Sequence, residues 1–437
     1  MRAAARRLLS LQLLGSQRAG PRSWIGGVAL SVVIFGRLSA VWRHALGPFL
    51  ALSVVLPGAT AAAESLDPET AALMESAFQG LGTAPIVDVH VHLVALNAEG
   101  AYVSPGKLSP ARPLEWLKTR LYLRASGVKD LARFDEAYVE RLLQRADGFP
   151  RPFRFHLLAM DYHYGKEGRR DLAHTEFYVP NELVVSLAER YPERIVPVVS
   201  VHPYRRDALE ELDRWAARGV RFVKWLPNAQ GMDPSDSLVD PFYARMKRHG
   251  MVLLSHAGEE KAVHARSAQA LGNPLKLRHA LDAGVRVIVA HCASLGRNED
   301  LDRPGRTASN FDLFLRLMSE ERYRGLLFGD ISAITQVNRM PGPLRTVLGR
   351  PDLQERLVNG SDYPLPGIPL LTLLQQFVHH GFVTKSEARA LANVFKSNPL
   401  LADFLLKRTI RDPASGRSLD PRIFTSAALL GAPSPSP

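Results

Sequence analysis

Residues 86–92 have the sequence Ile-Val-Asp-Val-His-Val-His, a mainly apolar run that ends in two histidines two positions apart. The β-branched residues in it favour a strand, in which successive side chains point to opposite faces. His90 and His92 are therefore expected on one face. The run opens a region in which short apolar segments alternate with longer amphipathic ones, a pattern that predicts parallel strands joined by helices.

This alternation recurs eight times between about residues 84 and 408. The expected strands are residues 86–91, 154–160, 195–201, 220–225, 251–255, 285–290, 326–331 and 356–360. Amphipathic stretches with helical spacing include residues 181–191, 207–218, 241–249, 274–283 and 311–320. Asn273 and Pro274 are typical of a helix start, and Gly284 of a helix end. Eight such units predict an α/β fold, the (β/α)8 TIM barrel, with a doubly wound sheet as the alternative.

Three segments depart from this pattern. Residues 95–151 are rich in Arg, Leu and aromatic residues, and we expect them to form a helical insertion that caps the barrel after its first strand. Residues 411–437 mix Pro, Ser, Gly and Ala without periodicity, which predicts a poorly ordered tail. Residues 1–63 form an apolar leader, so the predicted barrel domain covers residues 64–410.

The leader contains apolar stretches at residues 24–35 and 45–63, separated by Arg37, Arg43 and His44. The second stretch ends in Ala-Thr-Ala-Ala-Ala before Glu64, which is typical of a signal peptide with a small-residue cleavage site. We therefore expect an exported, periplasmic or membrane-anchored protein. Two apolar stretches also allow a membrane hairpin, and the arginine-rich, acid-free start allows a mitochondrial presequence.

Charge and cysteine content exclude several classes of protein. The formal net charge is +12, but residues 1–63 hold seven arginines and no Lys, Asp or Glu. The remainder has no Lys/Arg run that would follow a phosphate backbone, so we expect no nucleic-acid partner. Cys292 is the one cysteine, which rules out an intrachain disulfide and a cysteine-rich metal cluster.

Polar side chains end several of the other expected strands. His256, His291 and Asp362 follow the apolar runs of the fifth, sixth and eighth strands. Burying three or more imidazoles and a carboxylate without partners would be costly, and a shared cation removes that cost. A closed network of hydrogen bonds is the alternative. The carboxyl ends of barrel strands are where such enzymes carry their sites.

This set, together with Lys224 on the fourth strand, resembles the amidohydrolase superfamily, and more narrowly its amidohydrolase-related branch. The phrases that carry the resemblance are Gly219-Val-Arg-Phe-Val-Lys224-Trp-Leu-Pro227, Ser255-His256-Ala-Gly258 and Asn359-Gly-Ser-Asp362-Tyr-Pro364. The resemblance extends over about residues 84–408. It implies a metal-dependent enzyme acting on a small molecule, in a branch that includes hydrolases and non-redox decarboxylases.

By this resemblance, His90, His92, His256 and Asp362 bind a divalent metal, which we expect to be Zn²⁺. Such an ion lowers the pKa of its water from 15.7 toward about 7. Asp362 is expected to act as the general base that deprotonates this water and later protonates the leaving group. His291 is expected either to bind a second ion or to polarise the substrate and steady its oxyanion.

Lys224 bears on the number of metal ions. One possibility is that it reacts with carbon dioxide to form a carbamate that bridges two ions, with His256 and His291 on the second ion. The other is that it stays cationic beside a single ion and binds an anionic group of the substrate. We favour the single ion, because many members of this branch look mononuclear.

Three further residues, which follow the second and third strands, are candidates for substrate contacts: His163, His202 and Arg205. Exposed loop positions or a helix start explain them equally well.

The leading function is hydrolysis of an amide, ester, lactone or related C–N or C–O bond. The alternative is metal-dependent decarboxylation of a small carboxylic acid, and an exported non-catalytic binding module is a third hypothesis. The sequence does not predict the oligomeric state.

Overall fold

The computed structural model describes residues 67–263 and 265–431. The leader, for which we predicted an export signal or a membrane anchor, lies outside these residues. Within the described part of the chain, no helix combines the length and hydropathy needed to cross a bilayer.

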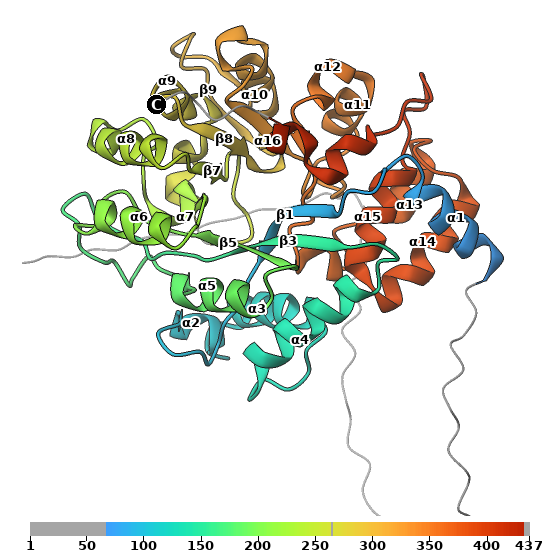
Figure 1. The fold of residues 1–437 in the computed structure, drawn as a ribbon, viewed down its shortest axis with the longest axis horizontal. Helices are drawn as coiled ribbons and strands as arrows, with labels where there is room; N and C mark the ends of the chain where they lie inside the picture. The colour runs from blue at the N-terminus through green and yellow to red at the C-terminus, as the bar shows by residue number, and fades with distance from the viewer. Residues whose placement is uncertain (1–66, 264, 432–437) are drawn as a thin grey trace, which may run out of the picture. The chain divides into compact units, whose positions relative to one another are not determined.

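Eight parallel strands form one sheet (Figure 1). In spatial order they are β1 (Ile86–His92), β3 (Phe153–Leu158), β5 (Ile195–Val199), β6 (Phe222–Trp225), β7 (Val252–Ser255), β8 (Arg286–Val289), β11 (Leu327–Asp330) and β12 (Leu357–Val358). The two outer strands of this order also meet. Val89 N–H donates to Asn359 O at 2.9 Å, and Asp362 N–H donates to His90 O at 2.9 Å. These bonds close the sheet, which confirms the predicted barrel over the doubly wound alternative.

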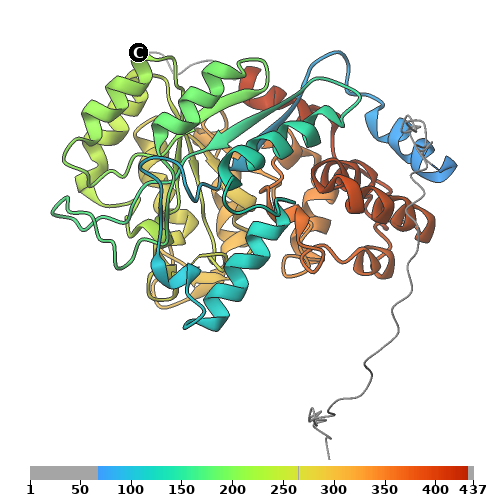
Figure 2. The same cartoon turned by 90° about the horizontal axis from the view of Figure 1, so that it is seen from below.

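Helices follow the strands and surround the sheet (Figures 1 and 2). In chain order they are α5 (Asn181–Arg190), α6 (Ala208–Ala217), α8 (Asp240–Arg248), α9 (Arg278–Asp282), α10 (Asn310–Ser319), α11 (Gly342–Gly349), α14 (Lys385–Ser397) and α15 (Pro399–Thr409). The start predicted at Asn273 is present, because its Oδ1 accepts a hydrogen bond from Leu275 N–H at 3.0 Å. Gly284, at φ 82°, follows α9 in the left-handed conformation expected of a helix end.

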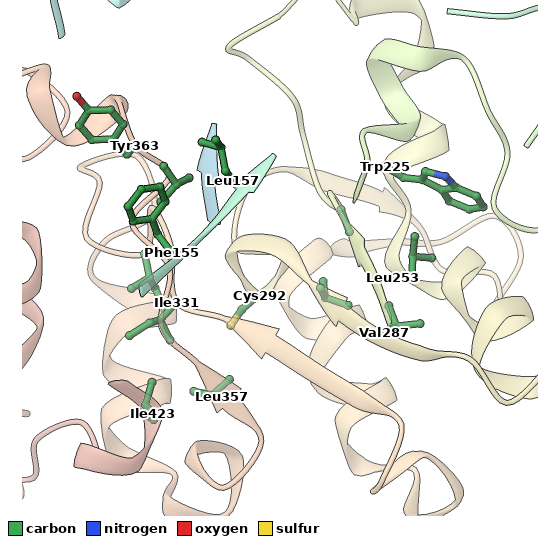
Figure 3. Packing of buried hydrophobic residues seen from close by; sticks show 14 of the residues in the cluster. Phe155, Leu157, Trp225, Leu253, Val287, Cys292, Ile331, Leu357, Tyr363 and Ile423 are labelled. Carbon is green, nitrogen blue, oxygen red and sulfur yellow. The ribbon is translucent and has the colours of Figure 1, made fainter. Parts of the chain in front are cut away.

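Two apolar layers hold the barrel together. Alternate strand residues such as Leu157, Leu253 and Val287 point outward and pack against the helices (Figure 3). The residues between them fill the interior: Val87, Val89, Leu158, Val198, Val252, Leu254, Ile288, Ala290, Phe328 and Val358. The period of two therefore separates the two layers, as it does in barrels generally.

A bulge in β1 changes which side chains face the interior. Asp88 pairs with Phe155 and Val91 with Leu157, so β1 has one more residue than β3 across this step. Val87 and Val89 face inward before the bulge, and His90 and His92 face the site after it. Period-two alternation from His90 would place Asp88 on the same face, but the bulge breaks that alternation. Asp88 Oδ1 instead accepts hydrogen bonds from the backbone N–H groups of His90 and Ser361, at 2.9 and 3.0 Å.

The insertion after β1 contains α2 (Pro105–Leu108), α3 (Pro113–Ala125) and α4 (Phe134–Asp147), with the short strand β2 (Tyr102–Val103) paired to β4 (Phe177–Tyr178). Helix α3 reaches the loop that follows β7, where Lys118 Nζ donates to Lys261 O at 2.7 Å. Burial, together with the charges of Glu260 and Asp362, raises the pKa of Tyr122 on the same helix. Helix α3 therefore lies at the carboxyl end of the barrel.

The C-terminal segment differs from the poorly ordered tail that we predicted. Residues 411–431 contain a 3₁₀ turn, Pro421–Thr425, and the helix α16 (Ala427–Gly431). Ile423 and Phe424 are buried, and Leu429 joins the apolar residues of the barrel interior. Few apolar residues occur here, and they lack helical or strand spacing, so no local pattern indicated that they pack against the barrel.

Two buried histidines, neither of them an expected metal ligand, make stability depend on pH. Burial lowers the pKa of both His156 and His202 to about 3. Each stays neutral in the fold but binds a proton below about pH 6.5 when unfolded, so stability is full above pH 6.5 and falls as the pH drops toward 3. Each histidine contributes up to about 1.4 kcal/mol per pH unit to the change in the free energy of unfolding.

We expect His156→Leu to flatten this pH dependence of the free energy of unfolding, measured by urea unfolding from pH 7 to 5. The exposed His379→Leu should leave it unchanged, and an equal slope in both variants would contradict the assignment.

Candidate metal centre

Polar side chains from six strands meet at the carboxyl end of the barrel. They come from the end of β1, from β6, from the turns after β7 and β8, from the end of β11 and from the turn after β12. In that order they are His90, His92, Lys224, His256, His291, Asp330 and Asp362. All but His92 are at least nine-tenths buried.

Three ligand atoms converge at the centre of this group. His90 Nε2 lies 3.2 Å from His92 Nε2, and Asp362 Oδ1 lies 3.6 and 3.2 Å from the same two nitrogens. Donors held about 2.1 Å from a tetrahedral ion are about 3.4 Å from each other. The spacing of these two imidazoles and the carboxylate therefore fits a divalent metal.

Asp330 holds two of the histidines in position. Its Oδ2 lies 2.9 Å from His90 Nδ1, and its Oδ1 accepts a hydrogen bond from His291 N–H at 2.9 Å. Burial acts to raise the pKa of Asp330, but His90 beside it keeps this pKa well below the usual value. Because the carboxylate occupies Nδ1 of His90, Nε2 is left facing the site, as in the carboxylate–histidine pairs of metal centres.

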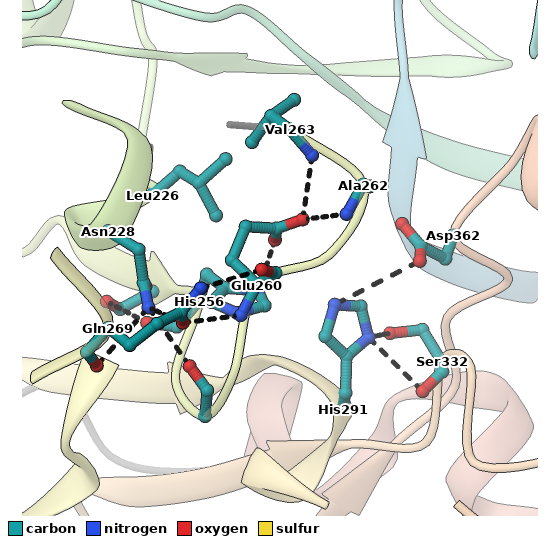
Figure 4. Close-up of polar contacts among 12 residues, drawn as sticks. Leu226, Asn228, His256, Glu260, Ala262, Val263, Gln269, His291, Ser332 and Asp362 are labelled. Carbon is teal, nitrogen blue, oxygen red and sulfur yellow. Dashed lines mark hydrogen bonds and ion pairs between the residues drawn. The ribbon is translucent and has the colours of Figure 1, made fainter. Parts of the chain in front are cut away.

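His256 supplies a nitrogen that lacks a partner. Its Nε2 is buried, and no residue in the described part of the chain forms a hydrogen bond with it. Its Nδ1 lies 3.5 Å from Glu260 Oε2, and its ring packs edge-on against His291 (Figure 4). Burial holds the pKa of His256 well below its usual value. A neutral imidazole with an unsatisfied buried nitrogen fits a metal ligand, because coordination would remove the desolvation cost.

The backbone is strained at both His291 and Asp362. His291, Cys292 and Ala293 have φ values of 56°, 50° and 48°, and Asp362 has φ 60°. Residues other than glycine in this left-handed region cost about 1–3 kcal/mol each, and such strain concentrates at functional sites. The turns bring His291 Nε2 to 4.0 Å from Asp362 Oδ2 (Figure 4).

The hydrogen bonds of His291 indicate which of its nitrogens carries the proton. Its Nδ1 lies 3.3 Å from Ser332 O, which can only accept, and 2.7 Å from Ser332 Oγ. Ser332 Oγ itself donates to Asp330 Oδ1. Nδ1 of a neutral His291 therefore carries the hydrogen, and Nε2 faces Asp362 as an acceptor. Of the two roles expected for His291, an acceptor nitrogen suits a metal ligand better than a donor to the substrate oxyanion.

Lys224 lies within the cluster. Its Nζ is 3.2 Å from His90 Nε2, and the side chain is 1% exposed. Burial lowers the pKa of Lys224 to about 8, although Asp330, Asp362 and Glu260 oppose the shift. The amine is therefore close enough to the histidines for either of the two roles considered from the sequence.

The three other candidates for substrate contact lie elsewhere. Both ring nitrogens of His202 are used, at 2.9 Å from Gln230 O and 3.1 Å from Tyr204 N. Arg205 pairs with Asp161 and Asp207. His163 faces Asp171, with 3.8 Å between Nδ1 and Oδ2. Each of these side chains therefore interacts with residues outside the histidine cluster.

Two residues of the site were missed in the sequence. Asp330 ends the strand β11. It is a polar residue at the end of an apolar run, which is the pattern that identified His256 and Asp362, so the sequence could have indicated it. Arg339 lies in the loop after β11, where no pattern indicates it. The side chain of Arg339 is buried, Nη1 donates to Ser294 Oγ at 3.0 Å, and Nε has no hydrogen-bond partner among the described residues.

Comparison with known proteins gives the following matches. A family model described as Amidohydrolase matches residues 87–370, and no curated protein matches the chain. One similar solved structure is an uncharacterized TIM-barrel protein from Bordetella bronchiseptica, with 17% identity, 73% of this chain and 99% of that chain covered, and a TM-score of 0.44. A probable 2-pyrone-4,6-dicarboxylic acid hydrolase from Acinetobacter baumannii has 13% identity, coverage of 71% and 99%, and a TM-score of 0.42.

A third similar structure is 5-carboxyvanillate decarboxylase from Sphingomonas paucimobilis, with 10% identity, 80% of this chain and 100% of that chain covered, and a TM-score of 0.44. The family model covers well over half of the present chain, from the first barrel strand to beyond the turn that carries Asp362. On this match, the protein belongs to the amidohydrolase family.

Proposed function

We propose that the protein is a metal-dependent hydrolase that cleaves an amide, ester, lactone or related C–N or C–O bond of a small molecule. Enzymes of the amidohydrolase family depend on a metal ion. The observation that carries the proposal is the convergence of His90 Nε2, His92 Nε2 and Asp362 Oδ1, with Asp330 on the other nitrogen of His90. Convergent donors backed by a carboxylate are what a metal site requires.

The proposed ligands are His90, His92, His256 and Asp362 around a single ion. Zn²⁺ is the proposed metal, because a site of imidazole nitrogens and a carboxylate suits an ion of borderline softness. The unpartnered Nε2 of His256 supports its inclusion. The alternative is the arrangement in which a carbamate of Lys224 bridges two ions. It would be supported if the protein held two ions per chain and lost both when Lys224 is replaced.

The ion would supply a Lewis acid and an acidified water at the reacting bond. Asp362 accepts a proton from the attacking water and returns it to the leaving group, because its Oδ2 faces the site while Oδ1 faces His90 and His92. His291 keeps Nε2 directed at Asp362, where it can accept a hydrogen bond from that carboxyl group once it has taken up the proton. Ser332 and Asp330 hold the ring in that orientation.

Arg339 and Lys224 favour an anionic substrate. Burial lowers the pKa of Arg339, but Asp362 and Glu260 oppose the shift, which indicates that the guanidinium lies near the same carboxylates. With Nε unpartnered, it can bind a carboxylate of the substrate. Lys224 offers a second positive group beside His90.

The test is a metal analysis of the purified chain, followed by a screen of anionic and neutral amides, esters and lactones. We expect activity to disappear with a chelator and to return with Zn²⁺. In water labelled with ¹⁸O, hydrolysis incorporates one labelled oxygen into the products. Carbon dioxide release with no label in the organic product would instead identify a decarboxylase.

The same screen tests the substrate charge. Arg339→Met should raise KM for the anionic substrate by about 10- to 100-fold, because a charged hydrogen bond is lost. The exposed Arg389→Met is the matched control and should leave KM unchanged. Equal KM values for all three proteins would contradict the role of Arg339.

A further inference from the structure

A second group of ligand atoms lies in the loop between β3 and β4 and shares no residue with the proposed metal centre. Its members are His163, Asp171 and His174, whose ligand atoms all lie within 4.8 Å of one another. Asp171 Oδ2 is 2.6 Å from His174 Nδ1 and 3.8 Å from His163 Nδ1. These two distances bracket the spacing of about 3.4 Å expected between donors on one tetrahedral ion.

The carboxylate is held in place by the loop itself. Asp171 Oδ1 accepts hydrogen bonds from the N–H groups of Ala173 and His174, at 3.0 and 3.2 Å. Its backbone N–H donates to His163 O at 2.8 Å, which places the two residues opposite each other across the loop. Since Oδ1 is occupied by the backbone, Oδ2 is the oxygen left to face the two imidazoles.

His163 is also held in place, and its inner nitrogen is unsatisfied. The Nδ1 atom is buried, and among the described residues it has no hydrogen-bond partner. On the other edge of the ring, a Cβ on Gly231 would lie only 2.0 Å from Nε2, so the ring fits because residue 231 is glycine. Burial lowers the pKa of His163, so the ring is neutral and its nitrogen can bind a metal.

Space is available beside the two rings. A cavity of about 10 Å³ is lined by His163, His174, Thr175 and Gln230 among others. That volume is on the order of one water molecule. His174 is 63% exposed, so an ion here could also keep water as a ligand.

We propose that His163, Asp171 and His174 form a second divalent-metal site that fixes the β3–β4 loop at the carboxyl end of the barrel. Two imidazole nitrogens and one carboxylate oxygen suit Zn²⁺, with water completing the coordination. Coordination through Nδ1 takes the place of the hydrogen bond between His174 and Asp171, and the ring then carries its hydrogen on Nε2. The site is structural and takes no part in the proposed hydrolysis.

The first experiment is a calorimetric titration of the full, metal-loaded chain with Zn²⁺. We expect one further equivalent to bind, and His174→Ala to abolish this binding. Asp171→Asn should weaken it at least about tenfold, because the amide keeps the loop's hydrogen bonds but loses the charge. His249→Ala is the matched control, since His249 pairs with Asp213 at 2.6 Å without forming such a group, and it should bind as the wild type does.

A second readout is cleavage of the loop by trypsin, which cuts after Lys166, Arg169 and Arg170. Zn²⁺ should slow this cleavage about tenfold in the wild type and leave it unchanged in His174→Ala. The ion binds only the folded conformation of the β3–β4 loop, and trypsin cuts the loop only when it unfolds locally. The proposal is overturned if His174→Ala still binds the further equivalent. It is also overturned if Lys224→Ala removes that equivalent, since the ion would then belong to the catalytic cluster.

Discussion

Asp362→Asn is expected to lower kcat by about 10²- to 10⁴-fold, which is the range that general acid–base catalysis contributes. The amide occupies the same volume in the turn after β12 and can still bind the ion through its oxygen. It cannot accept the proton that the carboxylate takes from water. The measurement is kcat at saturating substrate and saturating metal, so that weaker metal binding does not enter the result.

Asp330→Asn is the informative comparison, because this residue contacts His90 and His291 and is not a proposed ligand. It should lower metal affinity by about 10- to 100-fold, which is typical when the partner of a ligating histidine is lost. Most of its kcat should return when metal is added in excess. If Asp362→Asn recovered in the same way, Asp362 would be a ligand without a role in proton transfer.

His256→Ala is expected to remove the bound ion from the purified protein and with it all measurable turnover. The structure leaves His256 Nε2 buried and without a partner, so the ion has a strong donor there that no neighbouring side chain replaces. Metal content by elemental analysis and turnover with and without added Zn²⁺ are the measurements.

Cys292→Ala is the control for this loss. Cys292 is fully buried, and its Sγ donates to Asp330 O at 3.2 Å, close to the cluster but directed away from the ligand atoms. The variant should keep its metal and nearly normal turnover. Full metal content and a normal rate in His256→Ala would show that the assignment of the site is wrong.

The corrections to the expected site come from contacts between distant segments. His202 and Arg205 follow a strand end as His256 does, and nothing in their local sequence distinguishes them. The difference lies in their neighbours, because Gln230 O forms a hydrogen bond with His202 and Asp161 forms an ion pair with Arg205. In the same way, Arg339 reaches the site from a long loop whose path depends on the packing of the whole barrel end.

The eight strands and the ring of polar strand ends followed from the sequence alone. Both depend on local periodicity: apolar runs of period two predict strands, and a polar residue that ends such a run must emerge at the barrel mouth. His90, His92, His256, His291 and Asp362 were identified in this way, and the structure brings them together. The pairing of one particular strand with another was not needed for that prediction.

Only the tertiary structure decided the rest. The bulge in β1 turns Asp88 away from the site, the left-handed turns aim His291 and Asp362 at each other, and residues 419–429 pack beneath the barrel. Each of these features depends on hydrogen bonds or apolar contacts with residues far away in the chain. Their free energy appears only when the barrel closes, so no local pattern of residues records it.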